Sequence, residues 1–189
     1  QDRYAVTIDT EGTAVSAHYE YELTFLAERP DPDSVVTKVV VNFRNLRGNI
    51  GEFKIPNSKM FGASTYAFLP TGLPSEVSLS GPVGTYSVPI LSWYLPAEEV
   101  SVGAAFKVPD TTLDGSLHFS GTGKWPLTDH GRATIELKLS FFVPQGPKQA
   151  LVDTKAKFTS LASFDAKTGQ LLQSEGKLDG FGGTSSFKV

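Results

Sequence analysis

The stretch that decides the fold reads Ala133-Thr134-Ile135-Glu136-Leu137-Lys138-Leu139-Ser140-Phe141. Its odd-numbered side chains are apolar and its even-numbered side chains are polar throughout. Successive side chains of a β-strand point to opposite faces, so a period of two is typical of a strand with one buried and one solvated face. We therefore expect Ile135, Leu137 and Leu139 to be buried and their even-numbered neighbours to face solvent.

Two hairpins follow from the residues that flank this stretch. Residues 117–125 alternate in the same way, and Thr128–Gly131 supplies turn-forming residues with a glycine where a positive φ is needed. Further on, Val152–Phe164 and Gln170–Leu178 are joined by Asp165–Gly169, which begins with an aspartate and ends with a glycine. This order of residues is typical of a type I turn followed by a bulge.

The N-terminal region shows the same alternation. Thr13–Phe25 places its aromatic and aliphatic residues at odd positions, and Val35–Phe43 is a second apolar stretch. Tyr4–Ile8 alternates more weakly, and we expect it to fold back on Thr13–Phe25 through a turn at Asp9–Gly12. An intramolecular hairpin of this kind favours a monomer, although terminal strands can also be lent to a neighbouring chain, so self-association stays open.

Proline and glycine punctuate the whole chain, with 12 and 18 residues respectively. No amphipathic helix longer than about two turns is evident. The sequence predicts a single all-β domain over residues 1–189, an antiparallel β-sandwich or incompletely closed β-barrel built from two similar halves. The halves are residues 1–82 and 110–189, and the proline-rich residues 82–109 form the connector and an edge strand between them.

Composition excludes several classes of protein. The formal net charge is −3, so the sequence lacks the basic stripe expected of a nucleic-acid binder. No apolar run approaches the roughly 20 residues that cross a bilayer, so no membrane-spanning segment is predicted. The chain contains no cysteine, which excludes disulfides, thiolate metal sites and thiol catalysis.

Catalytic and metal-binding signals are weak. His18 and His118 fall on the polar faces of predicted strands and His130 falls in a turn, so neither a catalytic residue, a cofactor-binding residue nor a histidine metal site is predicted. Two aspartate pairs, Asp31 with Asp33 and Asp110 with Asp114, have oxygens suited to calcium, but aspartate is also a common turn residue. We expect a protein that is not an enzyme and has no cofactor.

Aromatic residues offer one candidate binding surface. Tyr19, Tyr21 and Phe25 share one face of a predicted strand, and Phe119 and Trp125 share a face of another. Large rings commonly fill the core of a β-sandwich. On a strongly curved sheet the same rings would instead present an apolar face to a ligand.

Two motifs, in this order, carry a family resemblance. Leu95–Gly103 matches the pattern leucine-proline, three residues, valine-x-valine-glycine, and Phe164–Gly176 reads FDAKTGQLLQSEG. Both resemble uncharacterised bacterial exported proteins and lipoproteins, over roughly residues 65–180. The match departs after Gly103, where the family usually has aspartate, a small residue and tryptophan. The resemblance implies export and an all-β fold, and it transfers no site.

The sequence thus predicts a non-enzymatic exported binding protein of the bacterial periplasm, cell surface or extracellular space, with an apolar small molecule as its ligand. One observation argues against a carrier. The half-barrels that transport lipids or lipoproteins usually close their sheet with helices, and this sequence predicts no such helices. The alternative is a structural subunit of an extracellular fibre or sheath, assembled by pairing of strands at sheet edges.

Overall fold

Eleven strands form one antiparallel sheet in the computed structural model. The structure describes residues 2–12, 16–27, 37–69, 71, 74–80, 89–90, 94–96, 98–113, 117–142, 155–180 and 183–189. The strands are β1 (Asp2–Gly12), β2 (Ser16–Ala27), β3 (Thr37–Ile50), β4 (Phe53–Phe68), β5 (Pro74–Ser80), β6 (Ala105–Leu113), β7 (Leu117–Asp129), β8 (Arg132–Phe142), β9 (Lys155–Asp165), β10 (Leu171–Gly180) and β11 (Gly183–Lys188). The expected all-β antiparallel fold is confirmed, and the sheet does not close into a barrel.

The order of the strands is β5-β4-β3-β2-β1-β11-β10-β9-β8-β7-β6. Each strand therefore pairs with its neighbours in sequence, except that β5 and β6 are not paired with each other. At the centre, β1 pairs with β11 from Thr7↔Lys188 to Gly12↔Gly183. The two edges of the sheet are β5 and β6, and the connector between them begins after Ser80. Residues 105–109 of the expected connector belong to β6, which is an edge strand.

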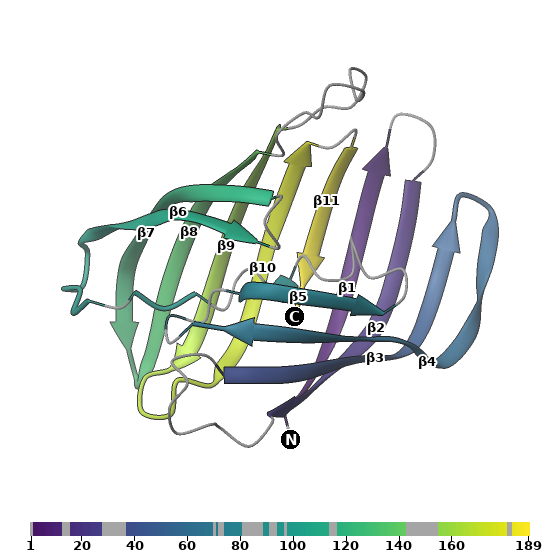
Figure 1. The fold of residues 1–189 in the computed structure, drawn as a ribbon, viewed down its shortest axis with the longest axis horizontal. Helices are drawn as coiled ribbons and strands as arrows, with labels where there is room; N and C mark the ends of the chain where they lie inside the picture. The colour runs from purple at the N-terminus through teal and green to yellow at the C-terminus, as the bar shows by residue number, and fades with distance from the viewer. Residues whose placement is uncertain are drawn as a thin grey trace.

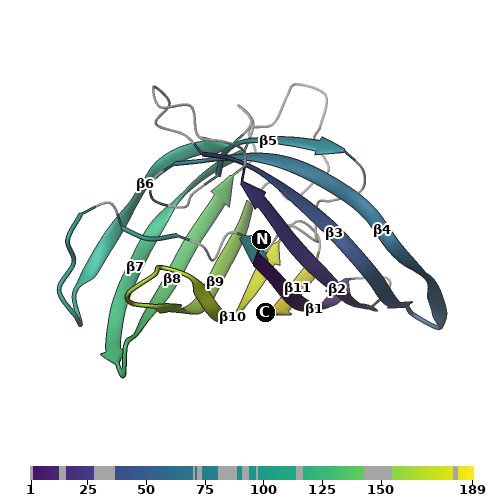
Figure 2. The same ribbon diagram turned by 90° about the horizontal axis from the view of Figure 1, so that it is seen from below.

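The sheet coils strongly, so that β3, β4 and β5 cross in front of β10, β11 and β1 (Figure 1). Seen from below, the same strands form an arch (Figure 2). The long strands β3 and β4 carry the chain around this bend, and their pairing slips at Phe43/Arg44 and at Leu46/Gly48. Asn45 between these slips has a φ of 54°. Bulges of this kind bend a strand and increase its twist, which is how one sheet encloses a core.

Strand β8 has the predicted register. Ile135, Leu137 and Leu139 are buried, and Lys138 is exposed on the other face. The burial pattern alternates along the whole strand, from Ala133 to Phe142. The expectation from the period of two is confirmed at each of its three named core positions.

The two predicted turns are also confirmed. His130 and Gly131 lie between β7 and β8 with φ values of 48° and 77°, which is the left-handed geometry of a tight hairpin. In the loop between β9 and β10, Asp165 Oδ1 accepts hydrogen bonds from the backbone N–H of Lys167 (2.9 Å) and of Thr168 (2.7 Å). The pairing of β9 with β10 then slips between Leu171 and Gln173. Residues 152–154 of the predicted first strand lie outside the described residues.

The N-terminal hairpin is confirmed, but its predicted turn at Asp9–Gly12 is wrong. Tyr4 pairs with Leu23 and Ile8 pairs with Tyr19, as expected of an intramolecular hairpin. Asp9–Gly12 continues β1 as regular strand, because it is hydrogen-bonded to β2 on one side and to β11 on the other. Two ladders outweigh the local turn preference of these residues. The connection lies at residues 13–15, outside the described residues.

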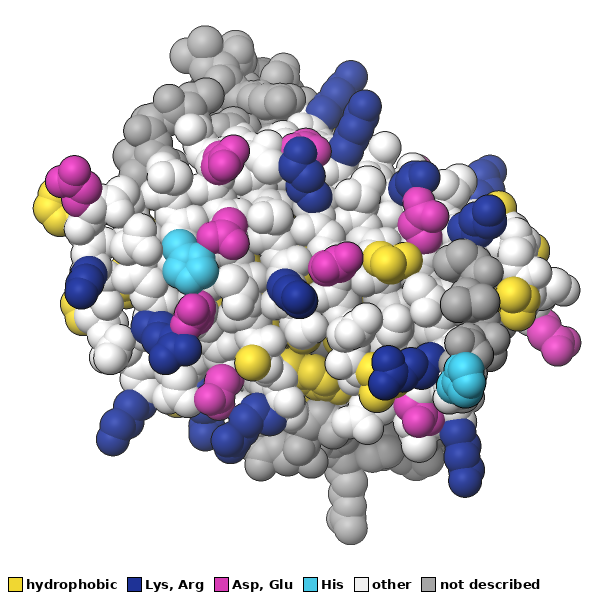
Figure 3. Space-filling view, turned by 180° about the vertical axis from the view of Figure 1, so that it is seen from behind, with side chains coloured by type: hydrophobic (Ala, Val, Ile, Leu, Met, Phe, Trp, Pro, Cys, Tyr) yellow, Lys and Arg dark blue, Asp and Glu magenta, His cyan; other side chains and the backbone are white. Residues whose placement is uncertain are grey.

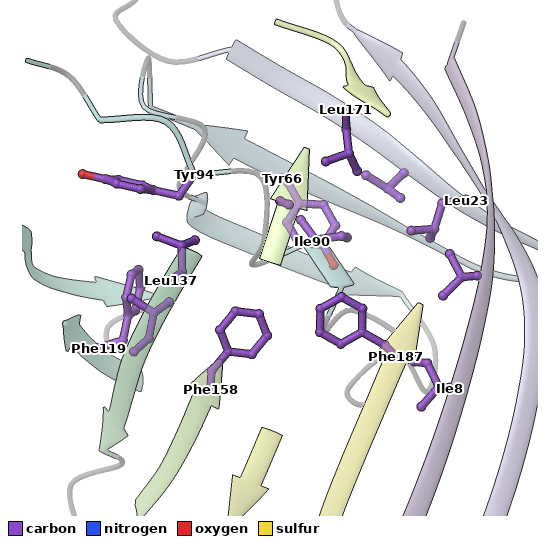
Figure 4. Close-up of a cluster of buried hydrophobic side chains, with 14 of the residues drawn as sticks. Ile8, Leu23, Tyr66, Ile90, Tyr94, Phe119, Leu137, Phe158, Leu171 and Phe187 are labelled. Atoms are coloured by element: carbon purple, nitrogen blue, oxygen red, sulfur yellow. The ribbon is translucent and has the colours of Figure 1, made fainter. Parts of the chain in front are cut away.

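The core lies inside the coil of the sheet (Figure 4). Phe158 of β9 and Phe187 of β11 stack with ring centroids 5.8 Å apart, and Tyr66 of β4 closes the opposite side. Ile90 and Tyr94 come from the connector and are also buried there. Part of the core is therefore supplied by a segment that belongs to no strand.

Candidate functional site

The five aromatic residues predicted to form a ligand face lie at different depths. Tyr21 and Phe119 are fully buried in the core. Tyr19 and Phe25 are half-buried and pack against that core. Trp125 is half-buried in β7, where its backbone N–H donates to the carbonyl of Ala104 (3.2 Å). The structure thus brings the first four residues to one apolar interior.

Further aromatic rings, which the sequence analysis did not single out, line the same interior. Phe25 meets Tyr4 edge to face at 5.6 Å, and Tyr21 lies 6.1 Å from Phe43. On the other side of the interior, Phe119 lies 5.6 Å from Phe141. Aromatic pairs at these separations add packing energy beyond the area that they bury. The interior is therefore apolar on both sides of the coil.

The gap between the two edges of the sheet is filled by the connector. Strands β5 and β6 approach each other but are not joined by a ladder. Tyr94 stacks on Phe106 of β6 at 5.7 Å, and the Leu95 N–H donates to the carbonyl of Thr71, ahead of β5 (2.7 Å). Burial raises the pKa of the Tyr94 hydroxyl, and the charge of Glu98 adds to the effect. Tyr94 and Leu95 of the connector thus contact β6 on one side and the turn ahead of β5 on the other.

A polar cluster lies on the outer face of the sheet, where acidic and basic side chains are interspersed (Figure 3). His18 Nδ1 lies 2.7 Å from Asp9 Oδ1, and His18 Nε2 lies 3.4 Å from Glu20 Oε1. The Arg47 guanidinium donates to the second oxygen of Glu20. His18, Glu20 and Arg47 border a surface hollow of ≈ 460 Å³, which Asn49 also lines. The sequence placed His18 on a polar face, and only the register Asp9↔His18 reveals its partner.

The protonation of His18 follows from this geometry. The hydrogen bond to Asp9 raises the pKa of His18 above its usual 6.5, burial opposes the rise, and Glu20 adds to it. In turn, the hydrogen bond from Arg47, helped by His18, lowers the pKa of the Glu20 carboxyl. A raised pKa means that the folded state binds the proton more tightly than the unfolded chain. The stabilisation that protonated His18 gives to the folded state is therefore fully present below pH 6.5, and it is lost as the pH rises through the pKa of His18 in the folded state.

We expect Asp9→Asn to lower the pKa of His18, because the substitution removes the charged partner of the Nδ1 proton. The measurement is a ¹³C or ¹H NMR titration of the imidazole in wild type and variant. An unchanged His18 pKa in Asp9→Asn would contradict the paired geometry.

A second hollow, of ≈ 430 Å³, lies at the ends of β7, β8 and β9. His118, Asp110 and Lys157 line it, and the Thr112 hydroxyl lies 3.2 Å from His118 Nδ1. Within the described part of the chain, no three His, Asp or Glu side chains are grouped so that they would hold a metal ion. Of the four aspartates with oxygens suited to calcium, Asp31, Asp33 and Asp114 lie outside the described residues.

None of the described segments forms a helix of the length and apolarity needed to cross a membrane. No family model, no curated protein and no solved structure matches the chain.

Proposed function

We propose that the protein is a non-enzymatic, exported carrier that holds an apolar small molecule inside its coiled sheet. The observation that carries this proposal is that part of the interior is occupied by the connector rather than by a strand. Ile90 and Tyr94 are 1% and 3% exposed, so they fill the volume that a ligand would take. The resemblance of Leu95–Gly103 and Phe164–Gly176 to exported proteins supports export.

The connector is suited to give way because it seals a gap that no ladder closes. Displacing a strand breaks a row of backbone hydrogen bonds, whereas β5 and β6 are not hydrogen-bonded to each other. Moving Ile90 and Tyr94 outward mainly exposes apolar surface, and an apolar ligand that enters restores that burial. Local openings of this kind draw on the least stable elements of a fold.

The edges of the sheet favour a carrier over the subunit of a fibre. β6 carries Lys107 and Pro109, both exposed. The first half of β4, which pairs with β3 but not with β5, carries Lys54 and Pro56, also exposed. Lysine and proline on an edge strand oppose pairing with another chain. The N-terminal strand lies at the centre of the sheet between β2 and β11, so lending it to a neighbour would break two ladders.

The test is titration with a fluorescent apolar probe, cis-parinaric acid. We expect the wild type to bind the probe and Ile90→Ala to bind it roughly tenfold more tightly, because the smaller side chain leaves part of the volume of Ile90 open to the probe. Val108→Ala is the matched control, since Val108 is equally buried but lies in the wall, on β6. Its affinity for the probe should not rise.

Stability is measured in parallel, because Ile90→Ala removes buried atoms and is expected to lower the free energy of unfolding by about 2–5 kcal/mol. If that variant does not fold, Ile90→Val provides a smaller change of about 1 kcal/mol. Failure of both the wild type and the folded Ile90 variant to bind the probe would contradict the carrier. Equal gains in Ile90→Ala and Val108→Ala would show an ordinary core cavity instead.

A further inference from the structure

The tip of the hairpin formed by β3 and β4 exposes two apolar side chains that face each other. Phe53 is 82% exposed and Ile50 is 44% exposed. They pair directly across the turn at Gly51 and Glu52. Single exposed apolar residues are ordinary on a protein surface, but an opposed pair at the end of a hairpin is a small apolar patch.

This patch continues into the interior of the sheet. Ile50 pairs with Ala17 of β2. Two residues further along β3, Gly48 pairs with Tyr19 of β2 on one side and with Ile55 of β4 on the other, so Tyr19 and Ile55 lie on the same face of the sheet as Ile50. Tyr19 and Ile55 are half-buried and pack against the core. An apolar strip therefore runs from the exposed tip to the aromatic interior.

The hairpin lies at the margin of the sheet, with its β3 strand paired with β2 as far as Ile50. In Figure 1 it lies beyond β2, and in Figure 2 it ends the arch on one side. The ladder between β4 and β5 begins only at Ala63, so Phe53–Gly62 pairs with β3 alone among the described strands. Nothing described in the fold covers the apolar tip on its outer side.

The charge of the hairpin is opposite in sign to that of the protein. Residues 44–60 carry four basic side chains, Arg44, Arg47, Lys54 and Lys59, against the single carboxylate of Glu52, whereas the whole chain has a formal charge of −3. Lys54 and Lys59 are exposed, whereas Arg47 and Arg44 lie opposite Glu20 and Glu22 of β2, and the Arg47 guanidinium donates to Glu20. Basic groups beside exposed apolar side chains fit an anionic lipid surface, where each adds to the attraction.

We propose that the tip of the β3–β4 hairpin docks on an anionic lipid membrane, with Phe53 and Ile50 entering the interface and the basic side chains contacting the headgroups. The patch is much narrower than the roughly 1,000 Å² expected of a stable protein–protein interface, which favours lipid over a protein partner. Passage of an apolar ligand along the strip, from the membrane to the interior of the sheet, would be a further step, and only that step rests on the proposed carrier function. Docking itself is measured without ligand.

The first experiment is co-sedimentation with sucrose-loaded vesicles, either phosphatidylcholine alone or an equimolar mixture with phosphatidylglycerol. We expect binding to the mixed vesicles, weaker binding to pure phosphatidylcholine, and loss of binding as salt is raised. Phe53→Ser should lower the partition coefficient roughly tenfold or more, and Lys54→Ser roughly fivefold. Leu161→Ser is the matched control, because Leu161 is an exposed apolar residue of β9 remote from the tip.

The second experiment places a reporter at the tip. Because the chain has no cysteine, Glu52→Cys gives a unique site for the environment-sensitive fluorophore NBD, and Glu175→Cys on β10 gives a control site. We expect a blue-shifted, brighter emission with mixed vesicles at position 52 and no change at position 175. Absence of vesicle binding overturns the proposal, and so does binding that shifts both labels equally or that Phe53→Ser leaves intact. Binding of cis-parinaric acid without binding of vesicles would support the proposed carrier function and contradict the docking of the hairpin on a membrane.

Discussion

Leu137→Ala is expected to lower the free energy of unfolding by about 2–5 kcal/mol. Leu137 is 0% exposed at the middle of β8. Its neighbours in register on the adjacent strands are small, Gly123 on β7 and Ser160 on β9, and the ring of Phe106 on β6 lies over Gly123. The cost of a cavity grows with the volume that stays empty, so the position within this range depends on how far the Phe106 ring moves toward the cavity.

The measurement is urea denaturation followed by far-ultraviolet circular dichroism. Leu161→Ala is the control, because Leu161 is 43% exposed on the adjacent strand and faces solvent. It should change stability by no more than about 0.5 kcal/mol. Equal losses in the two variants would mean that the inner and outer faces of β8 and β9 are wrongly assigned.

Gly121→Ala is expected to cost about 3 kcal/mol or more, or to prevent folding into a soluble protein. A Cβ atom at Gly121 would clash with the carbonyl oxygen of Lys138 and lie 2.9 Å from the Cα of Leu139. Both are backbone atoms of β8, which is hydrogen-bonded on each side to β7 and β9. Neither atom can move without disturbing two ladders, so the clash is not relieved by a side-chain rotation.

Gly131→Ala separates this steric effect from the conformational preference of glycine. Gly131 has a φ of +77°, but a methyl group at that position would have no heavy atom within 4 Å beyond its chain neighbours. Its replacement should cost about 1–2 kcal/mol, the penalty for a left-handed residue with a side chain. Thermal denaturation of both variants is the comparison, and a larger loss in Gly131→Ala than in Gly121→Ala would contradict the close approach of β7 to β8.

Local sequence patterns predicted strands and turns where a single preference dominates. In β8 each apolar side chain alternates with a polar one, and one face is buried, so a register shifted by one residue would expose the whole apolar set. At His130–Gly131 the local turn preference and the pairing of β7 with β8 agree. Agreement between local and long-range preferences is what makes an element predictable.

The same reasoning failed where long-range pairing decides. Asp9–Gly12 contains typical turn residues, yet it lies between two strands whose ladders hold it extended. No period in the sequence reveals that the last strand pairs with the first, because Thr7 and Lys188 are nearly the whole chain apart. The turn was misplaced for this reason, although the hairpin itself was predicted.

The candidate site was predictable only in part. The alternation placed Tyr19, Tyr21 and Phe25 on one face, and the structure sets them against the interior. The role of Ile90 and Tyr94 as fillers depends on how far the sheet coils, and that coiling arises at the irregular pairing of β3 with β4. The exposure of Phe53 likewise follows from where β5 begins to pair, which no local pattern specifies.

Because β1 pairs with β11, the two ends of the chain lie in neighbouring strands at the centre of the sheet, and the two edges of the sheet are strands from the middle of the chain. If the chain were permuted to begin at β6 and to end at β5, with β11 joined to β1, every ladder in the described sheet would connect consecutive strands. The natural order instead requires one ladder between residues about 180 positions apart, and closing so long a loop is a slow step in folding. Until that ladder forms, β1–β5 and β6–β11 are two meanders that each leave an open edge at the future centre of the sheet. The order of the chain therefore delays the protection of these two edges from other chains until the final joining event.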